Sequence, residues 1–326
     1  MKVLVTGGAG YIGSVAVKRL VELDHNVVVI DNLAKGLRKL VDSHAEFYEG
    51  DLLDRNFLGK VFQNHKFESV MHFAGYKDAG ESMENPGKYS QNIAGSINLL
   101  DEIVKHKVPQ IIFSSSAAVY GEPESIPIDE EHPTNPTNYY GFTKLKVEEL
   151  IRWYANLHKF RYLCLRYFNV AGDGGLGYID PNATNILPIL MEVAANKRDK
   201  VIIFGSDYDT RDGTCIRDYI DVNDLIEAHL EGLSLDNNEV INLGTSKGVS
   251  VLEMIKAVET VVKKKLKFEI GPRRSGDPAC LTASFTRAKN VLGWEPRMAL
   301  EKMIASTWKE PTGLKLLGFD WRTENK

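Results

Sequence analysis

The stretch Val3-Leu4-Val5-Thr6-Gly7-Gly8-Ala9-Gly10-Tyr11-Ile12-Gly13 decides the fold that we predict for this chain. It begins with a short apolar run typical of a buried strand, and an amphipathic helix pattern extends from Ile12 to Leu23. Between them the glycines match G-x-G-x-x-G from Gly8 and the wider G-x-x-G-x-x-G from Gly7. A strand, a glycine turn and a helix in this order are typical of the first unit of a doubly wound α/β sheet.

The same turn predicts a dinucleotide site. Glycines let the backbone approach a pyrophosphate closely, and the helix N-terminus offers free N–H groups and the positive end of its dipole. An acidic residue, Asp31, ends the next strand pattern. Its carboxylate would accept hydrogen bonds from the ribose hydroxyls of an adenosine and would repel a 2′-phosphate, so we expect NAD rather than NADP.

The rest of the first half alternates short strands with longer helices. Runs rich in β-branched residues at 27–30, 69–73 and 111–113 are separated by helical patterns at 53–63 and 89–106; a helix at 139–158 and a strand at 162–168 follow. This alternation predicts βαβ units in a parallel sheet with helices on both faces. The expected fold is α/β, a Rossmann-type doubly wound parallel sheet with a smaller α/β C-terminal domain for the substrate.

The boundaries between the two parts follow from a change in the sequence pattern after Asn169, where the regular alternation of strand and helix patterns ends. We expect residues 1–168, joined again by 219–246, to form the nucleotide domain, and residues 169–218 and 247–326 to form the smaller one. Within the latter, Asp180-Pro181 is expected to cap a helix at 186–195, and another helix is expected at 251–262.

Composition and charge are those of an ordinary globular protein. The 326 residues are 43% hydrophobic and 26% charged, and 40 Lys and Arg against 44 Asp and Glu leave a formal net charge of −4. This balance favours neither nucleic acid nor a membrane as a partner. Three widely spaced cysteines form no zinc or disulfide pattern, so we expect no metal and a cytoplasmic location. No signal peptide and no run near the ~20 apolar residues of a membrane span are recognisable.

A candidate catalytic set follows the run at 111–113. Ser114 to Ser116 end that strand pattern, where ligands bind in open α/β sheets. Tyr140 and Lys144 lie four residues apart, so they share one face of a helix. An ammonium held near a phenol lowers the phenol's pKa from about 10 towards neutrality. Each feature alone has an ordinary structural explanation, but beside a dinucleotide turn they predict a site for alcohol oxidation.

With these motifs the chain resembles the extended short-chain dehydrogenase/reductase family, also called the NAD-dependent epimerase/dehydratase family. The similarity is closest to the branch that epimerises UDP-hexoses. It covers nearly the whole chain through segments 5–14, 72–77, 113–121, 165–169, 213–220 and 242–251. The segment at 213–220 is the most specific, because it lies outside the generic cofactor half.

The resemblance implies an NAD-dependent isomerase that interconverts UDP-galactose and UDP-glucose through a 4-keto intermediate. It makes Tyr140 the base, Ser116 a hydrogen-bond partner of the reacting oxygen, and Lys144 a ligand of the nicotinamide ribose. The residues that it places against NAD are Gly7, Gly10, Tyr11, Ile12, Gly13, Asp31, Asn32, Leu33, Asp51, Leu52, Phe73, Ala74, Gly75, Lys77, Asn92, Ser114, Tyr140, Lys144 and Tyr167. Those that it places against the UDP-sugar are Lys77, Ser116, Tyr140, Phe168, Asn169, Asn185, Ile186, Ile202, Phe204, Arg217, Arg274, Asp277 and Leu281.

The resemblance also implies a homodimer in which the helices at 89–106 and 139–158 pair with their copies as four helices. Ile93, Ile97, Leu100 and Val104 form an apolar stripe at helical spacing. That stripe could equally be buried against the sheet of its own chain, and the sequence does not separate the two arrangements.

Several positions depart from the family pattern. Tyr139 stands where proline is common before the base, Ala118 where threonine is frequent, and Gly172-Asp173-Gly174 where Gly-Ala-His is frequent. Leu281 occupies a position that varies between tyrosine and smaller residues, and a tyrosine there crowds the substituent at C2 of the sugar. Leucine is smaller, so we expect partial tolerance of N-acetylated sugars.

Other functions stay open at this point. A 4,6-dehydratase needs an extra acid and base, whereas Ala117 and Ala118 follow Ser116, which argues against it. Epimerases of UDP-N-acetylhexosamines or UDP-glucuronate are not excluded. A non-catalytic NAD-sensing protein would have no need of Ser116, Tyr140 and Lys144 together.

Overall fold

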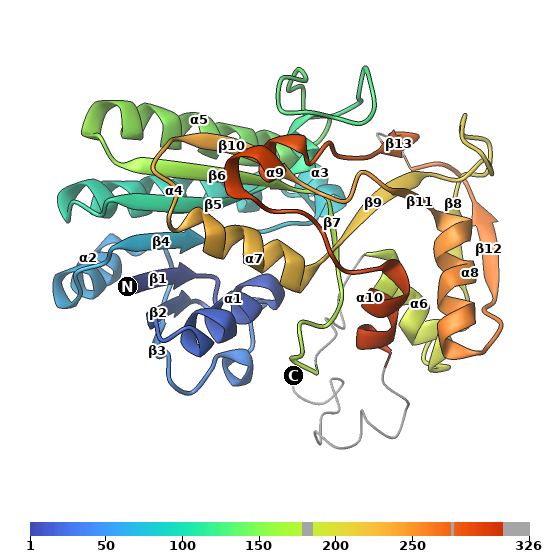
Figure 1. The fold of residues 1–326 in the computed structure, drawn as a ribbon, viewed down its shortest axis with the longest axis horizontal. Coiled ribbons are helices and arrows are strands. Elements are labelled where there is room, and N and C mark those ends of the chain that lie inside the picture. Colours follow the sequence, from blue (N-terminus) through green and yellow to red (C-terminus); the bar gives the residue numbers. More distant parts are fainter. Residues whose placement is uncertain (178–184, 275–276, 309–326) are drawn as a thin grey trace.

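A computed structural model describes residues 1–177, 185–274 and 277–308. A larger lobe is built on one broad sheet, and a smaller lobe packs beyond the carboxyl ends of its strands (Figure 1). Among the described residues, no helix combines the length and the apolar character needed to cross a membrane.

The broad sheet has seven strands in the order β10-β6-β5-β4-β1-β2-β3, and all its pairings are parallel. The strands are β1 (Lys2–Thr6), β2 (Asn26–Asp31), β3 (Glu46–Glu49), β4 (Ser69–His72), β5 (Gln110–Ser116), β6 (Arg161–Tyr167) and β10 (Glu239–Leu243). The chain proceeds from β1 to β3 on one side and returns to β4 on the other, so the strand order switches between β1 and β4. Ligands bind at such a switch point. The expected doubly wound parallel sheet is confirmed.

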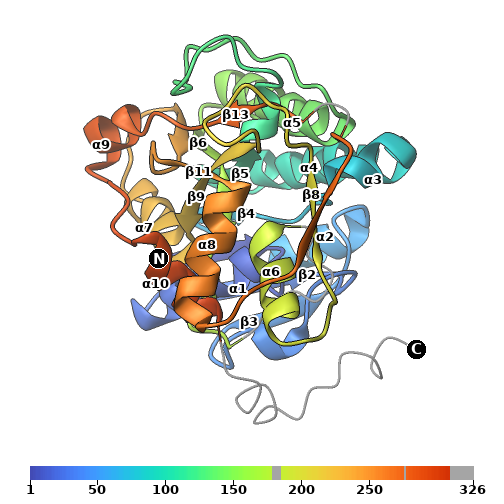
Figure 2. The same ribbon diagram turned by 90° about the vertical axis from the view of Figure 1, so that its right-hand side faces the viewer.

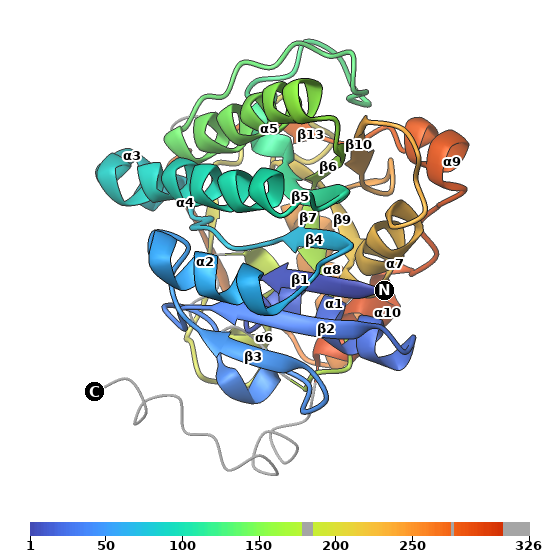
Figure 3. The same cartoon turned by 90° about the vertical axis from the view of Figure 1, so that its left-hand side faces the viewer.

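Helices cover both faces of this sheet. One face carries α2 (Arg55–Asn64), α4 (Pro86–Lys105) and α5 (Tyr139–His158), which form one layer in Figure 3. The other carries α1 (Tyr11–Glu22) and α7 (Val222–Gly232). Apolar side chains such as Leu99 and Ile151 on the first face and Val17 and Leu225 on the second are fully buried, and this burial stabilises the layers.

Local sequence explains where these helices begin. The Asp54 side chain accepts hydrogen bonds from the backbone N–H groups of Asn56 and Phe57, both at 3.0 Å, and so caps α2. The α4 helix starts at Pro86, before the predicted position 89, because proline has no N–H to leave unpaired and its fixed φ suits the first helical turn.

The smaller lobe has its own core and sheets (Figure 2). Its strands are β7 (Asn169–Ala171), β9 (Ile216–Asp221), β11 (Gly248–Ser250) and β13 (Cys280–Leu281) in one sheet, and β8 (Val201–Phe204) with β12 (Phe268–Gly271) in another. Its helices are α6 (Ile186–Ala194), α8 (Val251–Val262) and α10 (Leu300–Thr307). Two short helices, α3 (Ala79–Glu84) and α9 (Thr286–Leu292), flank the larger lobe.

One local prediction for this lobe lies outside the described residues, because it concerns Asp180 and Pro181. The helix itself lies where it was expected, and α6 begins at Ile186 with Asn185 as the residue before its first turn.

Candidate active site

The turn between β1 and α1 leaves no room for side chains. Gly7 has a φ of +74°, and a Cβ there would lie 2.6 Å from the nitrogen of Ala74. A Cβ on Gly13 would lie 2.1 Å from the carbonyl oxygen of Gly7. Among the residues that the structure describes, no side chain caps the N-terminus of α1 at Gly10. This bare backbone at a helix start fits a pyrophosphate.

Carboxylates lie at the same end of the site. The two oxygens of Asp31 accept hydrogen bonds from the backbone N–H groups of Ala9 at 3.0 Å and Leu33 at 2.9 Å. Burial raises the pKa of Asp31, and these two bonds oppose that rise. The Asn32 amide donates to the Asp51 carboxylate at 2.8 Å. These polar side chains have the chemistry to hold ribose hydroxyls.

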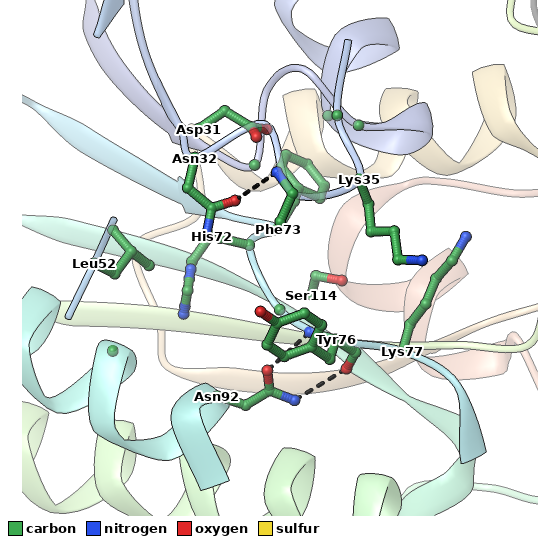
Figure 4. A pocket seen from close by; sticks show the side chains of 18 of the residues that line it. Asp31, Asn32, Lys35, Leu52, His72, Phe73, Tyr76, Lys77, Asn92 and Ser114 are labelled. Atoms are coloured by element: carbon green, nitrogen blue, oxygen red, sulfur yellow. Dashed lines mark hydrogen bonds between the residues drawn. The ribbon is translucent and has the colours of Figure 1, made fainter. Parts of the chain in front are cut away.

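These groups open into a cavity of about 360 Å³ (Figure 4). Of the residues predicted to contact the cofactor, all but Leu33 line this cavity. Leu33 packs against the core instead and contributes its backbone N–H to Asp31. Asn185, predicted to contact the substrate, lines the same cavity from the start of α6.

The predicted catalytic residues meet where β5 ends. Ser116 is the last residue of β5, and its side chain lies close enough to the phenol of Tyr140, in the first turn of α5, to lower the pKa of that phenol. Lys144 donates to the carbonyl oxygen of Ser114 at 2.6 Å, and its Nζ lies 5.9 Å from the ring centroid of Tyr140. Tyr140 and Lys144 line the cavity, whereas Ser116 does not.

The neighbouring Tyr139 does not share this environment. Its ring stacks on Phe142 with centroids 5.4 Å apart, and its hydroxyl is bonded to Ser90 at 2.7 Å. Only Tyr140 of the two adjacent tyrosines lines the cavity.

The pKa values differ from the expectation drawn from spacing. Burial raises the pKa of Tyr140, and the nearby Ser116 hydroxyl opposes the rise. Burial lowers the pKa of Lys144 to about 8, and the charge of Glu148 opposes that fall. The lowered tyrosine pKa expected from the spacing alone is therefore wrong, because burial dominates at Tyr140 and the Lys144 ammonium is bound to a backbone carbonyl and not to the phenol.

Sequence reasoning missed several residues that line the cavity. His72 is buried between Thr6 at 2.7 Å and Ser96 at 2.9 Å, and burial with the nearby Lys144 charge lowers its pKa to about 3. Lys35, like Lys77, extends into the cavity (Figure 4). The only signal for these residues was their nearness in sequence to Asp31 or to the segment at 72–77.

The other residues predicted to bind substrate lie away from this cavity, and most of them belong to the smaller lobe. Arg217 on β9 donates to the carbonyl oxygen of Pro278 at 2.8 Å and pairs with Asp277 at 3.4 Å. The guanidinium of Arg274 stacks 3.9 Å above the ring of Phe204. None of the following lines the cavity: Ser116, Phe168, Asn169, Ile186, Ile202, Phe204, Arg217, Arg274, Asp277 and Leu281.

A comparison with models of known families matches the larger lobe and part of the smaller one. The model described as the NAD dependent epimerase/dehydratase family matches residues 3–244, well over half of the chain. The chain belongs to this family. NAD is accordingly its cofactor, and the bare turn at Gly7 to Gly13 fits the pyrophosphate of that molecule.

Individual members of the NAD-dependent epimerase/dehydratase family are similar over nearly the full length. The chain is 44% identical to a UDP-glucose 4-epimerase of Halalkalibacterium halodurans, with 100% of this chain and 99% of the relative covered. A crystal structure of UDP-glucose-4-epimerase from Stenotrophomonas maltophila with bound NAD and formylated UDP-arabinopyranose has a TM-score of 0.93 at 38% identity, covering 97% and 99% of the two chains. The UDP-Glc/GlcNAc 4-epimerase of Campylobacter jejuni has a TM-score of 0.83 at 40% identity, covering 94% and 97%.

Proposed function

We propose that this chain catalyses the NAD-dependent 4-epimerisation of a UDP-hexose, interconverting UDP-galactose and UDP-glucose. The observation that carries the proposal is that Tyr140, with Ser116 beside it, lines the same cavity as Lys144, the glycine turn and Asp31. The relative from Halalkalibacterium halodurans carries the same activity in its name.

In the proposed reaction, Tyr140 takes the proton of the sugar 4-hydroxyl, and Ser116 holds the reacting oxygen. Bound NAD supplies a transient hydride acceptor for C4 and a positive charge that lowers the raised pKa of Tyr140. The resulting 4-ketose would rotate in the site and present the other face of C4. Reduction at C4 from that face, with return of the proton from Tyr140 to the 4-oxygen, would complete the inversion. Lys144 binds the nicotinamide ribose and adds to the positive potential around the phenol.

For the UDP moiety we propose the residues of the smaller lobe. A guanidinium forks onto phosphate oxygens, so Arg217 and Arg274 suit a diphosphate, and the Phe204 ring suits stacking with a base. Asn169, Asn185 and Asp277 are proposed as hydrogen-bonding contacts, with Lys77, Phe168, Ile186 and Ile202 completing the surface.

A second substrate class is suggested by Leu281. This residue packs against a buried cluster that contains Phe168 and Ala117, and Ala117 directly follows Ser116 in the chain. We propose partial turnover of UDP-N-acetylhexosamines, an activity that the relative from Campylobacter jejuni has in its name.

We also propose a homodimer and a two-domain division. Trp153 and Leu157 on α5 are 67% and 66% exposed, which is unusual for large apolar side chains. Leu100 of the predicted stripe is fully buried in its own chain, so the proposed interface rests on the outer face of α5.

The proposed domains are 1–168 with 219–246, and 169–218 with 247–326. The three cysteines, all free, suit a cytoplasmic location.

The experiment that tests the activity is incubation of purified protein with UDP-galactose and no added cofactor, followed by NMR. Formation of UDP-glucose is expected. Activity that appears only after NAD is added would mean weak retention of the cofactor. No conversion of UDP-galactose even with NAD present would contradict the proposal.

A further inference from the structure

A buried cluster of charges lies beneath the cavity on the inner face of α5. Lys144 and Glu148 occupy successive turns of this helix and are 5% and 1% exposed. The two oxygens of Glu148 accept hydrogen bonds from Nε and Nη2 of Arg166 on β6, at 3.0 and 2.7 Å. Ser115 donates a further hydrogen bond to the same carboxylate. One carboxylate therefore faces two buried cations, and such groups are almost never fully buried unless they are paired.

The cluster is anchored so that Glu148 has a fixed position. Arg166 also donates to the hydroxyl of Tyr120 at 2.9 Å, and that hydroxyl donates to the side-chain oxygen of Asn242 at 2.7 Å. Asn242 donates in turn to the carbonyl oxygen of Ile128 at 3.0 Å. The network joins α5 to β6 and β10, so the negative charge cannot swing away to solvent.

The groups that face Lys144 from other elements bring no second negative charge. On β5 they are the carbonyl of Ser114 at 2.6 Å and the ring of Phe113 at 4.9 Å. On β4, His72 is neutral, since burial lowers its pKa to about 3. Tyr140 and, on β6, Tyr167 are phenols whose pKa values burial raises.

A thiol and a phenol near Glu148 add no further negative charge. Burial raises the pKa of Cys164 on β6, and the charge of Glu148 adds to that rise, so this thiol stays neutral. Burial raises the pKa of Tyr120 to about 12. Among the described residues, Glu148 is the carboxylate whose charge acts on Lys144.

We propose that Glu148 is a positioning residue that keeps Lys144 protonated and thereby sustains the positive potential that proton transfer at Tyr140 requires. Burial alone disfavours an ammonium, and an opposite charge one helical turn away favours it. With burial and the charge of Glu148 both acting, the pKa of Lys144 is about 8, so removing the opposing charge is expected to shift the amine towards its neutral form. The kinetic consequence rests on the proposed function, whereas the protonation of Lys144 does not.

The direct test is the variant Glu148→Gln, which keeps the shape and removes the charge. The matched control is Glu149→Gln, because Glu149 is the adjacent residue on α5 and forms a partly exposed pair with Lys146 at 2.7 Å. In protein labelled with [13C]lysine, the Cε resonance of Lys144, assigned from its loss in Lys144→Arg, reports the pKa in both variants. A fall by roughly one unit or more is expected in Glu148→Gln and none in Glu149→Gln. An unchanged pKa in Glu148→Gln would overturn the proposal.

A second variant covers the case in which Glu148→Gln does not fold because Arg166 is left unpaired. In Glu148→Gln/Arg166→Met both charges of the pair are gone, and a fall in the pKa of Lys144 in the same direction is expected, because the charge of Glu148 opposes the effect of burial. No fall in this double variant would equally overturn the proposal.

Kinetics separate the inference from the proposed function. In the pH profile of UDP-galactose turnover, the alkaline limb of Glu148→Gln is expected to move to lower pH by the same amount as the Lys144 titration. A shifted titration with an unshifted alkaline limb would overturn the link to proton transfer. An unmodified protein without any turnover would refute the proposed function, and the NMR titration would still decide the role of Glu148.

Discussion

The Nζ of Lys144 donates a hydrogen bond to the carbonyl oxygen of Ser114 at 2.6 Å and so ties α5 to the end of β5. Ser114 lies two residues before Ser116, and Lys144 lies one turn after Tyr140. A single hydrogen bond between a helix and a strand thus holds two parts of the proposed catalytic set together across 30 residues of chain.

Removal of the Tyr140 hydroxyl separates catalysis from binding. In Tyr140→Phe we expect turnover of UDP-galactose to fall by about 10²–10⁴-fold, the usual contribution of a general acid–base group. NAD should still co-purify, because the glycine turn is untouched. Tyr139→Phe is the control and should keep most of its activity, since Tyr139 lies outside the cavity. Equal rates in the two variants would exclude Tyr140 as the base.

The glycine turn gives a prediction about cofactor retention. In Gly13→Ala the new Cβ would meet the carbonyl oxygen of Gly7 at 2.1 Å, so the turn must shift and we expect NAD to be lost on gel filtration. Gly87→Ala on α4 is the control, because a Cβ there meets nothing within 4 Å. Absorbance of the released cofactor measures the outcome. Full NAD retention in Gly13→Ala would contradict a role for this turn in binding.

The buried His72 predicts a stability that depends on pH. Its pKa is about 3 when folded, against 6.5 as the ordinary value, so the unfolded chain binds more protons between these limits. The contribution of the neutral His72 to the free energy of unfolding is therefore fully present above about pH 6.5. It is lost as the pH falls towards 3, and the loss amounts to roughly 4–5 kcal/mol at most. Urea unfolding of His72→Gln should show a smaller acid loss than the wild type. His158→Gln, at an exposed site at the end of α5, should show the wild-type loss.

Leu281 predicts the choice of sugar. If leucine leaves room at C2, Leu281→Tyr should lower turnover of UDP-GalNAc relative to UDP-galactose by about tenfold or more, since a change of shape in a pocket gives discrimination of that order. Competition assays with both substrates measure the ratio. Absence of any UDP-GalNAc turnover in the wild type would refute the tolerance itself.

The exposed face of α5 predicts the assembly state. Trp153→Glu should convert the proposed dimer to a monomer in light scattering at micromolar concentration, because a charge would be buried in the interface. Leu23→Glu is the control, since Leu23 is 48% exposed at the end of α1, away from that face. A wild-type monomer would contradict the dimer directly.

The elements that could be predicted from sequence are those governed by local rules. The strand and helix around the glycine turn, and the helix at 139–158, appear where their periodicity placed them. The short strands of the smaller lobe, such as β8 and β11, were not predicted, because strands of three or four residues carry too few alternations to stand out from a loop.

The sequence by itself determined the doubly wound sheet, the turn that only glycines can form, and the shared helix face of Tyr140 and Lys144. These depend on φ, on steric clash and on the helical repeat, all of which act between near neighbours. Only the tertiary structure decided that the Lys144 ammonium binds the carbonyl of Ser114 and that Glu148 pairs with Arg166 beneath it. Such pairings and the pKa values that follow from them depend on burial, and burial is set by the packing of segments far apart in the chain.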